Sequence, residues 1–153
     1  MTTVNLSEHD SLLNQYLAEI RDKSYQRNRT LFRNNIRRIG EMMAYEISKT
    51  LTYKVRTVTT PLGTCDIPLI KDDLLLATVL RAGLPFHEGF LHVFVRVHIA
   101  CVIGTPEGVE MLEKNVSPDV TLWCAAIDPG MNEHKYIVPG FGDCGDLCYG
   151  EKL

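Results

Sequence analysis

A glycine- and aspartate-rich stretch near the C-terminus carries the residues best suited to chemistry. Residues 136–150 read YIVPGFGDCGDLCYG, so an apolar run enters Pro139 and three glycines then alternate with Asp143 and Asp146. Glycine adopts φ > 0 without a Cβ penalty, and a loop stripped of side chains offers its peptide N–H and C=O groups to a ligand. The two carboxylates could hold a metal or a hydroxylated group. An ordinary polar turn explains the pattern equally well.

A second candidate site follows the apolar run at residues 74–80. The run stops at Arg81-Ala82-Gly83, and Pro85 is suited to the first turn of a helix. A strand, a turn containing glycine and a helix N-terminus together favour anions, because unpaired N–H groups and the positive end of the helix dipole converge there. Arg81 adds a forked cation at this place. Most turns of this kind bind nothing, so the pattern alone does not establish a site.

Five scattered cysteines form no C-x-x-C pair. Cys144 and Cys148 with the nearby His134 are a conceivable zinc site, but a second paired cluster is lacking. Cys101 and Cys124 lie in apolar runs, where a buried thiol behaves as a small hydrophobe. We therefore expect free thiols in a reducing compartment, and no protein-bound metal cluster.

The elements that must position these residues begin with two predicted helices and a hairpin. The first helix is expected over residues 5–23, capped by Ser7 or Ser11, and the second over residues 28–51. The apolar positions of the first are Leu12, Leu13, Tyr16, Leu17 and Ile20, and those of the second are Phe32, Ile36, Ile39, Met43 and Ile47. Residues 53–59 and 64–68 then predict a β-hairpin, with Pro68 keeping the returning strand at an edge.

The remaining chain alternates predicted strands and helices. Apolar runs at residues 74–80, 95–103 and 120–127 are typical of strands buried on both faces of a parallel sheet, and residues 136–138 predict a fourth short strand. Helices are expected from Pro85 and over residues 106–115, the latter capped by Thr105. Ligand groups gather at the carboxyl ends of parallel strands, so we expect Arg81, Asp128 and Asp143 to share one cleft.

Length and composition indicate an α/β protein with a single domain over residues 1–153. We divide it into a helical N-terminal arm (1–51), a hairpin (52–70), an α/β core (71–135) and a C-terminal loop segment (136–153). The net charge of −3 gives no global basic field for nucleic acid. The N-terminus does not read as a signal peptide and no apolar run is long enough to span a bilayer, so the expected location is the cytoplasm, without a membrane partner.

An arginine-rich stretch interrupts this acidic composition. Its cations are Arg21, Lys23, Arg27, Arg29, Arg33, Arg37 and Arg38. A phosphate-rich partner such as RNA, or an anionic membrane surface, would use such a stretch. Arginine-rich helix faces are more often solvated or paired across a subunit contact, and we favour that interpretation because the total charge is acidic.

At this point the chain resembles the uracil phosphoribosyltransferases, which are type I phosphoribosyltransferases of pyrimidine salvage. The matching stretches span nearly the whole chain in the family's order. They are Arg33 with residues 38–41 and 44–46, Thr60-Pro61-Leu62-Gly63, residues 80–85 with Glu88-Gly89, residues 106–109, Ala126-Ile127-Asp128 with Met131 and Asn132, and residues 136–146. The last stretch is specific to the family.

The resemblance implies a phosphoribosyltransferase-type sheet flanked by helices and transfer of phosphoribosyl from 5-phosphoribosyl 1-diphosphate (PRPP) to N1 of uracil, giving UMP and diphosphate with Mg²⁺ present. It assigns PRPP to Arg81, Ala82, Gly83 and Asp143, with Arg81 and Asp143 as the catalytic pair. It assigns uracil to Ile137, Gly140, Gly142, Asp143 and Cys144, while Phe141 could supply a stacking face. The family also self-associates, so a homo-oligomer is expected, and some relatives respond to GTP as an effector.

One departure from the family stands out. Members carry several dozen further residues between the helix after the Arg81 loop and the strand around His98, including the loop that cradles the 5′-phosphate of PRPP. Here residues 90–94 pass almost directly into residues 97–103. Either a stretch of a longer chain is omitted, or the chain is a shortened relative that binds uracil or UMP without PRPP chemistry. The junction favours omission, because a helix and a strand leave almost no turn residues between them.

Overall fold

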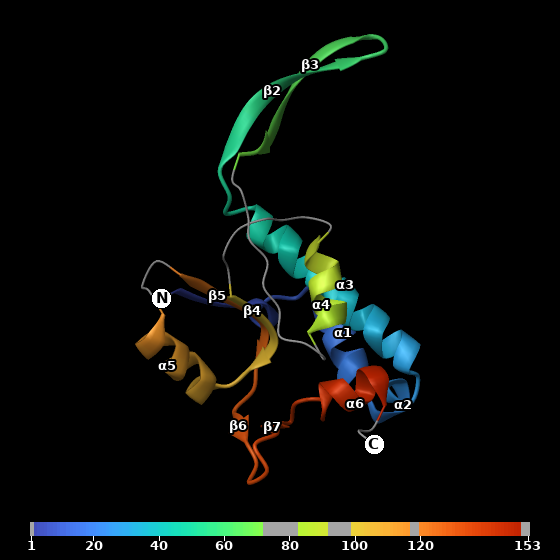
Figure 1. Ribbon diagram of the computed structural model, residues 1–153, viewed down its shortest axis with the longest axis vertical. Helices are drawn as coiled ribbons and strands as arrows, with labels where there is room; N and C mark the ends of the chain where they lie inside the picture. The colour runs from blue at the N-terminus through green and yellow to red at the C-terminus, as the bar shows by residue number, and fades with distance from the viewer. Residues whose placement is uncertain (1, 72–82, 92–98, 117–119, 151–153) are drawn as a thin grey trace.

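The computed structural model describes residues 2–71, 83–91, 99–116 and 120–150, and it is an α/β fold (Figure 1). Helices lie on both sides of a small parallel sheet, and a long hairpin projects away from them (Figure 1). The predicted fold class is therefore confirmed. The candidate strand at 74–80, with Arg81 and Ala82 after it, lies outside the described residues.

The sheet contains β1 (Thr2–Asn5), β5 (Thr121–Ile127) and β4 (Ile99–Gly104), in the order β1-β5-β4. Both neighbours run parallel to β5. The five central residues of β5 are buried, which confirms the prediction from its continuous apolar run. β5 is the central strand, so Asp128, which follows its carboxyl end, lies at the middle of one edge of the sheet.

The strand β4 differs from the prediction of a strand buried on both faces. Each of its residues is only half-buried, because β5 is its one pairing partner among the described residues. The helix that follows, α5 (Pro106–Asn115), begins and ends as predicted. Thr105 caps it by accepting a hydrogen bond of 3.2 Å from the N–H of Gly108.

The N-terminal prediction was wrong in its first residues. Instead of one helix over 5–23, the chain forms β1, a 3₁₀ turn η1 (Leu6–Glu8), then helices α1 (Leu12–Arg21) and α2 (Lys23–Gln26). β1 forms by pairing with β5, which is distant in the sequence. The four mostly polar residues of β1 do not by themselves predict a strand. Leu12, expected in the core, is 57% exposed.

Helix α3 (Arg29–Ser48) forms the centre of the hydrophobic core. Asn28 caps it by accepting hydrogen bonds from the N–H groups of Thr30 and Leu31. The predicted stripe is confirmed, since all of its members are at most 1% exposed: Phe32, Ile36, Ile39, Met43 and Ile47. Leu13, Leu17 and Ile20 of α1 pack in the same cluster. The helices of the N-terminal arm therefore contribute to the hydrophobic core.

Helix α4 (Leu84–Leu91) packs against α3 through two glycines. A Cβ on Gly40 would lie 2.6 Å from the carbonyl oxygen of Phe86, and a Cβ on Gly89 would overlap the carbonyl oxygen of Arg37. The two helix backbones therefore touch at a spacing that only glycine permits. In the turn before α4, the carbonyl oxygen of Gly83 accepts a hydrogen bond of 2.9 Å from the N–H of His87.

The predicted hairpin is confirmed and is slightly longer than expected. β2 (Tyr53–Thr60) and β3 (Gly63–Ile70) pair antiparallel along their whole length, with Pro68 opposite Val55. The hairpin projects away from the sheet, and nearly all of its residues are exposed (Figure 1). It includes Val55 at 62% and Leu62, at its tip, at 100% exposure.

Candidate functional site

The glycine loop begins from a small antiparallel ribbon rather than from the parallel sheet. β6 (Gly130–Met131) pairs with β7 (Ile137–Val138), so the short strand predicted at residues 136–138 is present but lies outside the parallel sheet. The side chain of Asn132 accepts hydrogen bonds from the N–H groups of His134 and Tyr136, which folds the intervening turn back on itself. The ribbon therefore carries the chain from Asp128 out and back before the loop starts.

The loop itself, residues 139–143, needs glycine at two positions. The Val138–Pro139 peptide bond is cis, Gly140 has φ +52° and Gly142 has φ +91°. A Cβ on Gly140 would overlap the carbonyl oxygen of Ile137. The glycine pattern predicted this backbone, in which Gly140 is buried and Gly142 is exposed.

Helix α6 (Cys144–Tyr149) replaces the second half of the predicted loop. Asp143 caps it by accepting a hydrogen bond of 3.0 Å from the N–H of Asp146. Gly145, which we expected at a positive φ or a close approach in a loop, is a buried residue of this helix. Asp143 and Cys144 thus lie at the junction of loop and helix.

Asp128 connects the sheet to the glycine loop. It is 5% exposed at the end of β5, and its N–H donates to the carbonyl oxygen of Gly104 at 2.9 Å. One carboxylate oxygen accepts from Arg21 at 2.8 Å and the other accepts from the N–H of Gly140 at 2.7 Å. The sequence predicted that Asp128 faces a common cleft, whereas the structure uses both of its oxygens to hold the loop and α1 together.

The N-terminal helices hold the loop at two further points. The amide of Gln26 donates to the carbonyl oxygen of Phe141 at 2.8 Å, and the ring of Phe141 meets Phe32 edge-on at 5.9 Å between centroids. Arg33 donates to the carbonyl oxygen of Cys148 at 2.5 Å. Arg21 and Arg33 of the arginine-rich stretch are therefore bonded within the chain.

Two thiols lie close together in this region. Cys144 and Cys148 lie 4.0 Å apart between sulfur atoms, and the hydrogen bond between them, together with burial, raises the pKa of Cys144 well above its ordinary value. A second pair, Cys101 and Cys124, faces across β4 and β5 at 3.2 Å. All five cysteines are free thiols. Among the described residues, no three His, Cys, Asp or Glu side chains gather as metal ligands would.

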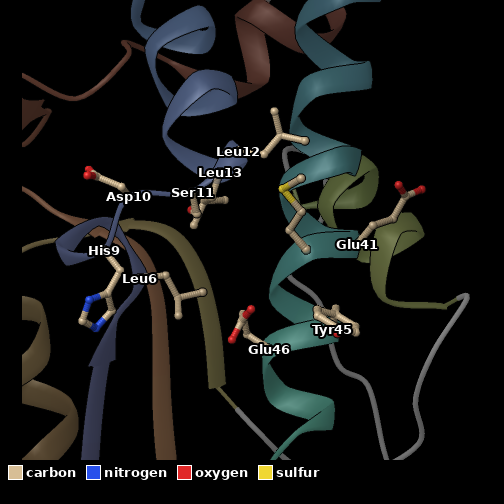
Figure 2. Close-up of a pocket in the computed structure, with 10 residues that line it drawn as sticks. Leu6, His9, Asp10, Ser11, Leu12, Leu13, Glu41, Tyr45 and Glu46 are labelled. Atoms are coloured by element: carbon tan, nitrogen blue, oxygen red, sulfur yellow. The ribbon is translucent and has the colours of Figure 1, made fainter.

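A separate cavity of 520 Å³ opens between the start of α1 and the middle of α3 (Figure 2). Figure 2 shows its walls coming from η1 and α1 on one side and from α3 on the other. Its lining is Leu6, His9, Asp10, Ser11, Leu12, Leu13, Glu41, Met42, Tyr45 and Glu46. Two of its carboxylates already pair with cations, Glu41 with Arg37 and Glu46 with Lys49. No candidate site residue lines this cavity.

The candidate residues divide by where the structure places them. Ile137, Gly140, Gly142, Asp143 and Cys144 lie together along the glycine loop and the first turn of α6. Gly83 lies in the turn before α4, while Arg81 and Ala82 fall outside the described residues, so their meeting with Asp143 stays a prediction. Sequence reasoning missed Arg21 and Gln26, whose contacts with the loop region join residues more than 100 positions apart.

No helix among the described residues is both long and apolar enough to cross a membrane. In a comparison of folds, the structure is similar to that of the AQ2163 protein from Aquifex aeolicus, with a TM-score of 0.78 and 19% identity. The similarity covers 97% of this chain and 98% of that one. At this identity the likeness supports the fold alone.

Comparison with known sequences identifies the family. The family model described as uracil phosphoribosyltransferase matches residues 7–100 and 94–151. A uracil phosphoribosyltransferase of Porphyromonas gingivalis is 37% identical over 216 residues, covering 100% of each chain, and one of Dictyoglomus turgidum is 28% identical, covering 92% of this chain and 96% of its own. The 216 aligned positions exceed the 153 residues of this chain by 63, in agreement with the internal departure noted from the sequence. The chain belongs to the uracil phosphoribosyltransferase family.

Proposed function

We propose that this phosphoribosyltransferase moves the phosphoribosyl group of PRPP onto N1 of uracil, giving UMP and diphosphate in pyrimidine salvage. The observation that carries the proposal is the glycine loop. Gly140 and Gly142 hold positive φ beside Asp143, and Gly142 is exposed, within a chain that matches the family on both sides of its internal departure. Its relatives are named for uracil and for this transfer.

The base is the part of the substrate that the described residues fit. The edge of uracil alternates carbonyl acceptors with an N–H donor, so fixed peptide groups can read it without charged side chains. We assign this reading to the backbone of Ile137 and of residues 140–144. The ring of Phe141 contacts Phe32 edge-on and packs, partly buried, against the hydrophobic core, and we assign its remaining surface to stacking on the planar base.

The charged part of the reaction falls to Arg81 and Asp143. Departure of diphosphate leaves an electron-poor sugar carbon, so catalysis requires stabilisation of the charge that grows on the leaving group. We assign that role to Arg81, with the backbone at Ala82 and Gly83 receiving the diphosphate. We assign Asp143 to PRPP as well. No covalent nucleophile is needed, which agrees with the raised pKa of the Cys144 thiol.

Mg²⁺ is the proposed cofactor. It prefers oxygen ligands and is commonly held by one or two carboxylates together with substrate phosphates. The donor chemistry fits, because Asp143 and Asp146 bring two carboxylates to the end of the glycine loop. When bound, the ion would neutralise charge on the diphosphate.

The shortened connection between α4 and β4 favours a second candidate function. A chain that keeps the uracil loop but lacks the segment that cradles the 5′-phosphate would bind uracil or UMP as a sensor or regulator. Two measurements on the purified 153-residue chain separate the candidates. Radiolabelled uracil with PRPP and Mg²⁺ yields labelled UMP if the enzyme proposal holds, whereas calorimetric binding of uracil or UMP without any product supports the binding protein.

Oligomer formation, GTP activation and cytoplasmic location belong to the same proposal. The long exposed hairpin with apolar residues such as Val55 and Leu62 supports self-association, because isolated apolar strands favour a partner surface. Light scattering should give a mass above the 17.3 kDa of one chain. A monomer at micromolar concentration would contradict this part of the proposal. Titration of turnover with GTP tests the effector.

A further inference from the structure

The loop that is proposed to read the base has to keep an unusual backbone without help from regular structure. It carries two positive-φ glycines, and the ribbon before it pairs only two residues on each side. Peptide groups discriminate a ligand's edge only when they are fixed in position before it binds. Some part of the chain must therefore supply the missing rigidity.

Asp128 supplies the strongest restraint. Its carboxylate is buried, with 6% of the side chain exposed, and a buried carboxylate requires a cation and hydrogen bonds. It has both, because Arg21 donates to Oδ1 at 2.8 Å and the N–H of Gly140 donates to Oδ2 at 2.7 Å. Charge-assisted bonds of this length are stronger than neutral ones. The loop is thus attached at its most constrained residue.

The attachment is itself rigid at its far end. The N–H of Asp128 bonds the end of β4 at Gly104, and Arg21 is the last residue of α1, which packs in the core through Leu17 and Ile20. The guanidinium keeps 28% of its side-chain surface exposed, so it is the solvent-facing partner of the pair. Sheet, helix and loop meet at a single carboxylate.

We propose that the Arg21–Asp128 pair is a positioning device for the uracil site, which fixes the loop at Gly140 so that the remaining peptide groups of residues 140–144 are held in position for the base. Neither side chain touches the base. Gln26 adds a second attachment at the carbonyl oxygen of Phe141. This inference rests on the proposed function. It assigns Arg21, from the arginine-rich stretch, and Asp128, at the end of β5, to uracil recognition rather than to PRPP binding.

The test compares Asp128→Ala, Arg21→Gln and Arg21→Lys with Glu110→Gln, which breaks an exposed ion pair on α5 far from the loop. Hydrogen exchange of the loop amides is followed by mass spectrometry, and uracil and PRPP affinities are measured separately. We expect faster exchange at Gly140 in Asp128→Ala and about a 10-fold or greater loss of uracil affinity, because a charge-assisted bond is removed. PRPP affinity should fall by less than uracil affinity, because Asp143 is the one loop residue among the four assigned to PRPP. Arg21→Lys should recover much of the loss of Arg21→Gln.

Two results would overturn the inference. The first is a hydrogen-exchange rate of the loop amides in Asp128→Ala that equals the parental rate. The second is faster loop exchange in Asp128→Ala together with a uracil affinity equal to that of Glu110→Gln. Should Asp128→Ala fail to fold, Arg21→Gln decides in the same way, because the partly exposed Arg21 side chain is replaced by a polar side chain that keeps a hydrogen-bond donor. A parent chain that binds no uracil would count against the proposed function instead. The exchange rates would still test whether Asp128 holds the loop at Gly140.

Discussion

Replacing Gly140 by alanine tests the backbone geometry of the site directly. At φ +52° a Cβ meets the local backbone, and left-handed geometry costs a non-glycine residue about 1–2 kcal/mol. The same Cβ would overlap the carbonyl oxygen of Ile137, so the turn must also shift, at a further cost of about 1–2 kcal/mol. We expect Gly140→Ala to lower the free energy of unfolding by about 2–4 kcal/mol, a large share of the usual 5–15 kcal/mol of a domain.

Two matched variants separate these contributions. Gly142 has φ +91° but its nearest neighbour is Leu147 at 3.9 Å, so Gly142→Ala should cost only the backbone strain of about 1–2 kcal/mol. Gly63 has no atom within 4 Å and no positive φ, so Gly63→Ala should be neutral or slightly stabilising. Urea unfolding followed by circular dichroism gives the three free energies. Equal stability of the Gly140 and Gly63 variants would refute the reasoning.

Further predictions concern the core, the helix contact and the thiols. Ile36→Ala should lower the free energy of unfolding by about 2–5 kcal/mol because the side chain is fully buried, while Leu62→Ala at the hairpin tip should change it by less than about 0.5 kcal/mol; urea unfolding measures both. Gly89→Ala should separate α4 from α3 and lower the melting temperature measured by calorimetry, and a parental melting temperature would contradict the close contact. The pKa of Cys144 is raised above the ordinary 9.0, so above that pH the unfolded chain loses this proton first and stability should fall by up to about 1.4 kcal/mol per pH unit. Cys144→Ala should reduce that slope in urea unfolding between about pH 9 and pH 10.5, and an unchanged slope would count against the burial of this thiol.

Much of the fold follows from local patterns in the chain. The stripe from Phe32 to Ile47 predicts α3 because apolar residues at three- and four-residue spacing can be buried only on one face of a helix. Thr105-Pro106 predicts the start of α5, and Thr60-Pro61-Leu62-Gly63 predicts the hairpin, since capping and turn residues act over a few positions. These signals need no knowledge of distant segments.

The errors arise where distant segments decide the structure. β1 exists because Val4 lies opposite Trp123 across the sheet, and nothing in its own four residues requires a strand. The short strand at Ile137 pairs with Met131 rather than joining the sheet, because Asn132 closes the turn between them. Cys144 begins a helix because Asp143 caps it, although the surrounding glycines favour a loop.

The candidate site shows the same division. The glycine pattern predicted a loop with positive φ, and the resemblance predicted its family. What holds the loop in place, the contact of Arg21 with Asp128 and of Asp128 with Gly140, joins three separate segments of the chain. A buried aspartate after an apolar strand indicates that some cation must pair with it, but only the folded chain identifies Arg21 among the many basic residues.

The measurement that tests the central claim most directly is product formation by the purified chain. Radiolabelled uracil is incubated with PRPP and Mg²⁺, and UMP and diphosphate are quantified over time beside Asp143→Asn and Leu62→Ala. The account predicts equal amounts of UMP and diphosphate from the parent and from the Leu62 variant, with a sharply lower rate for Asp143→Asn. Binding of uracil without any UMP would contradict the claim that this chain transfers phosphoribosyl groups.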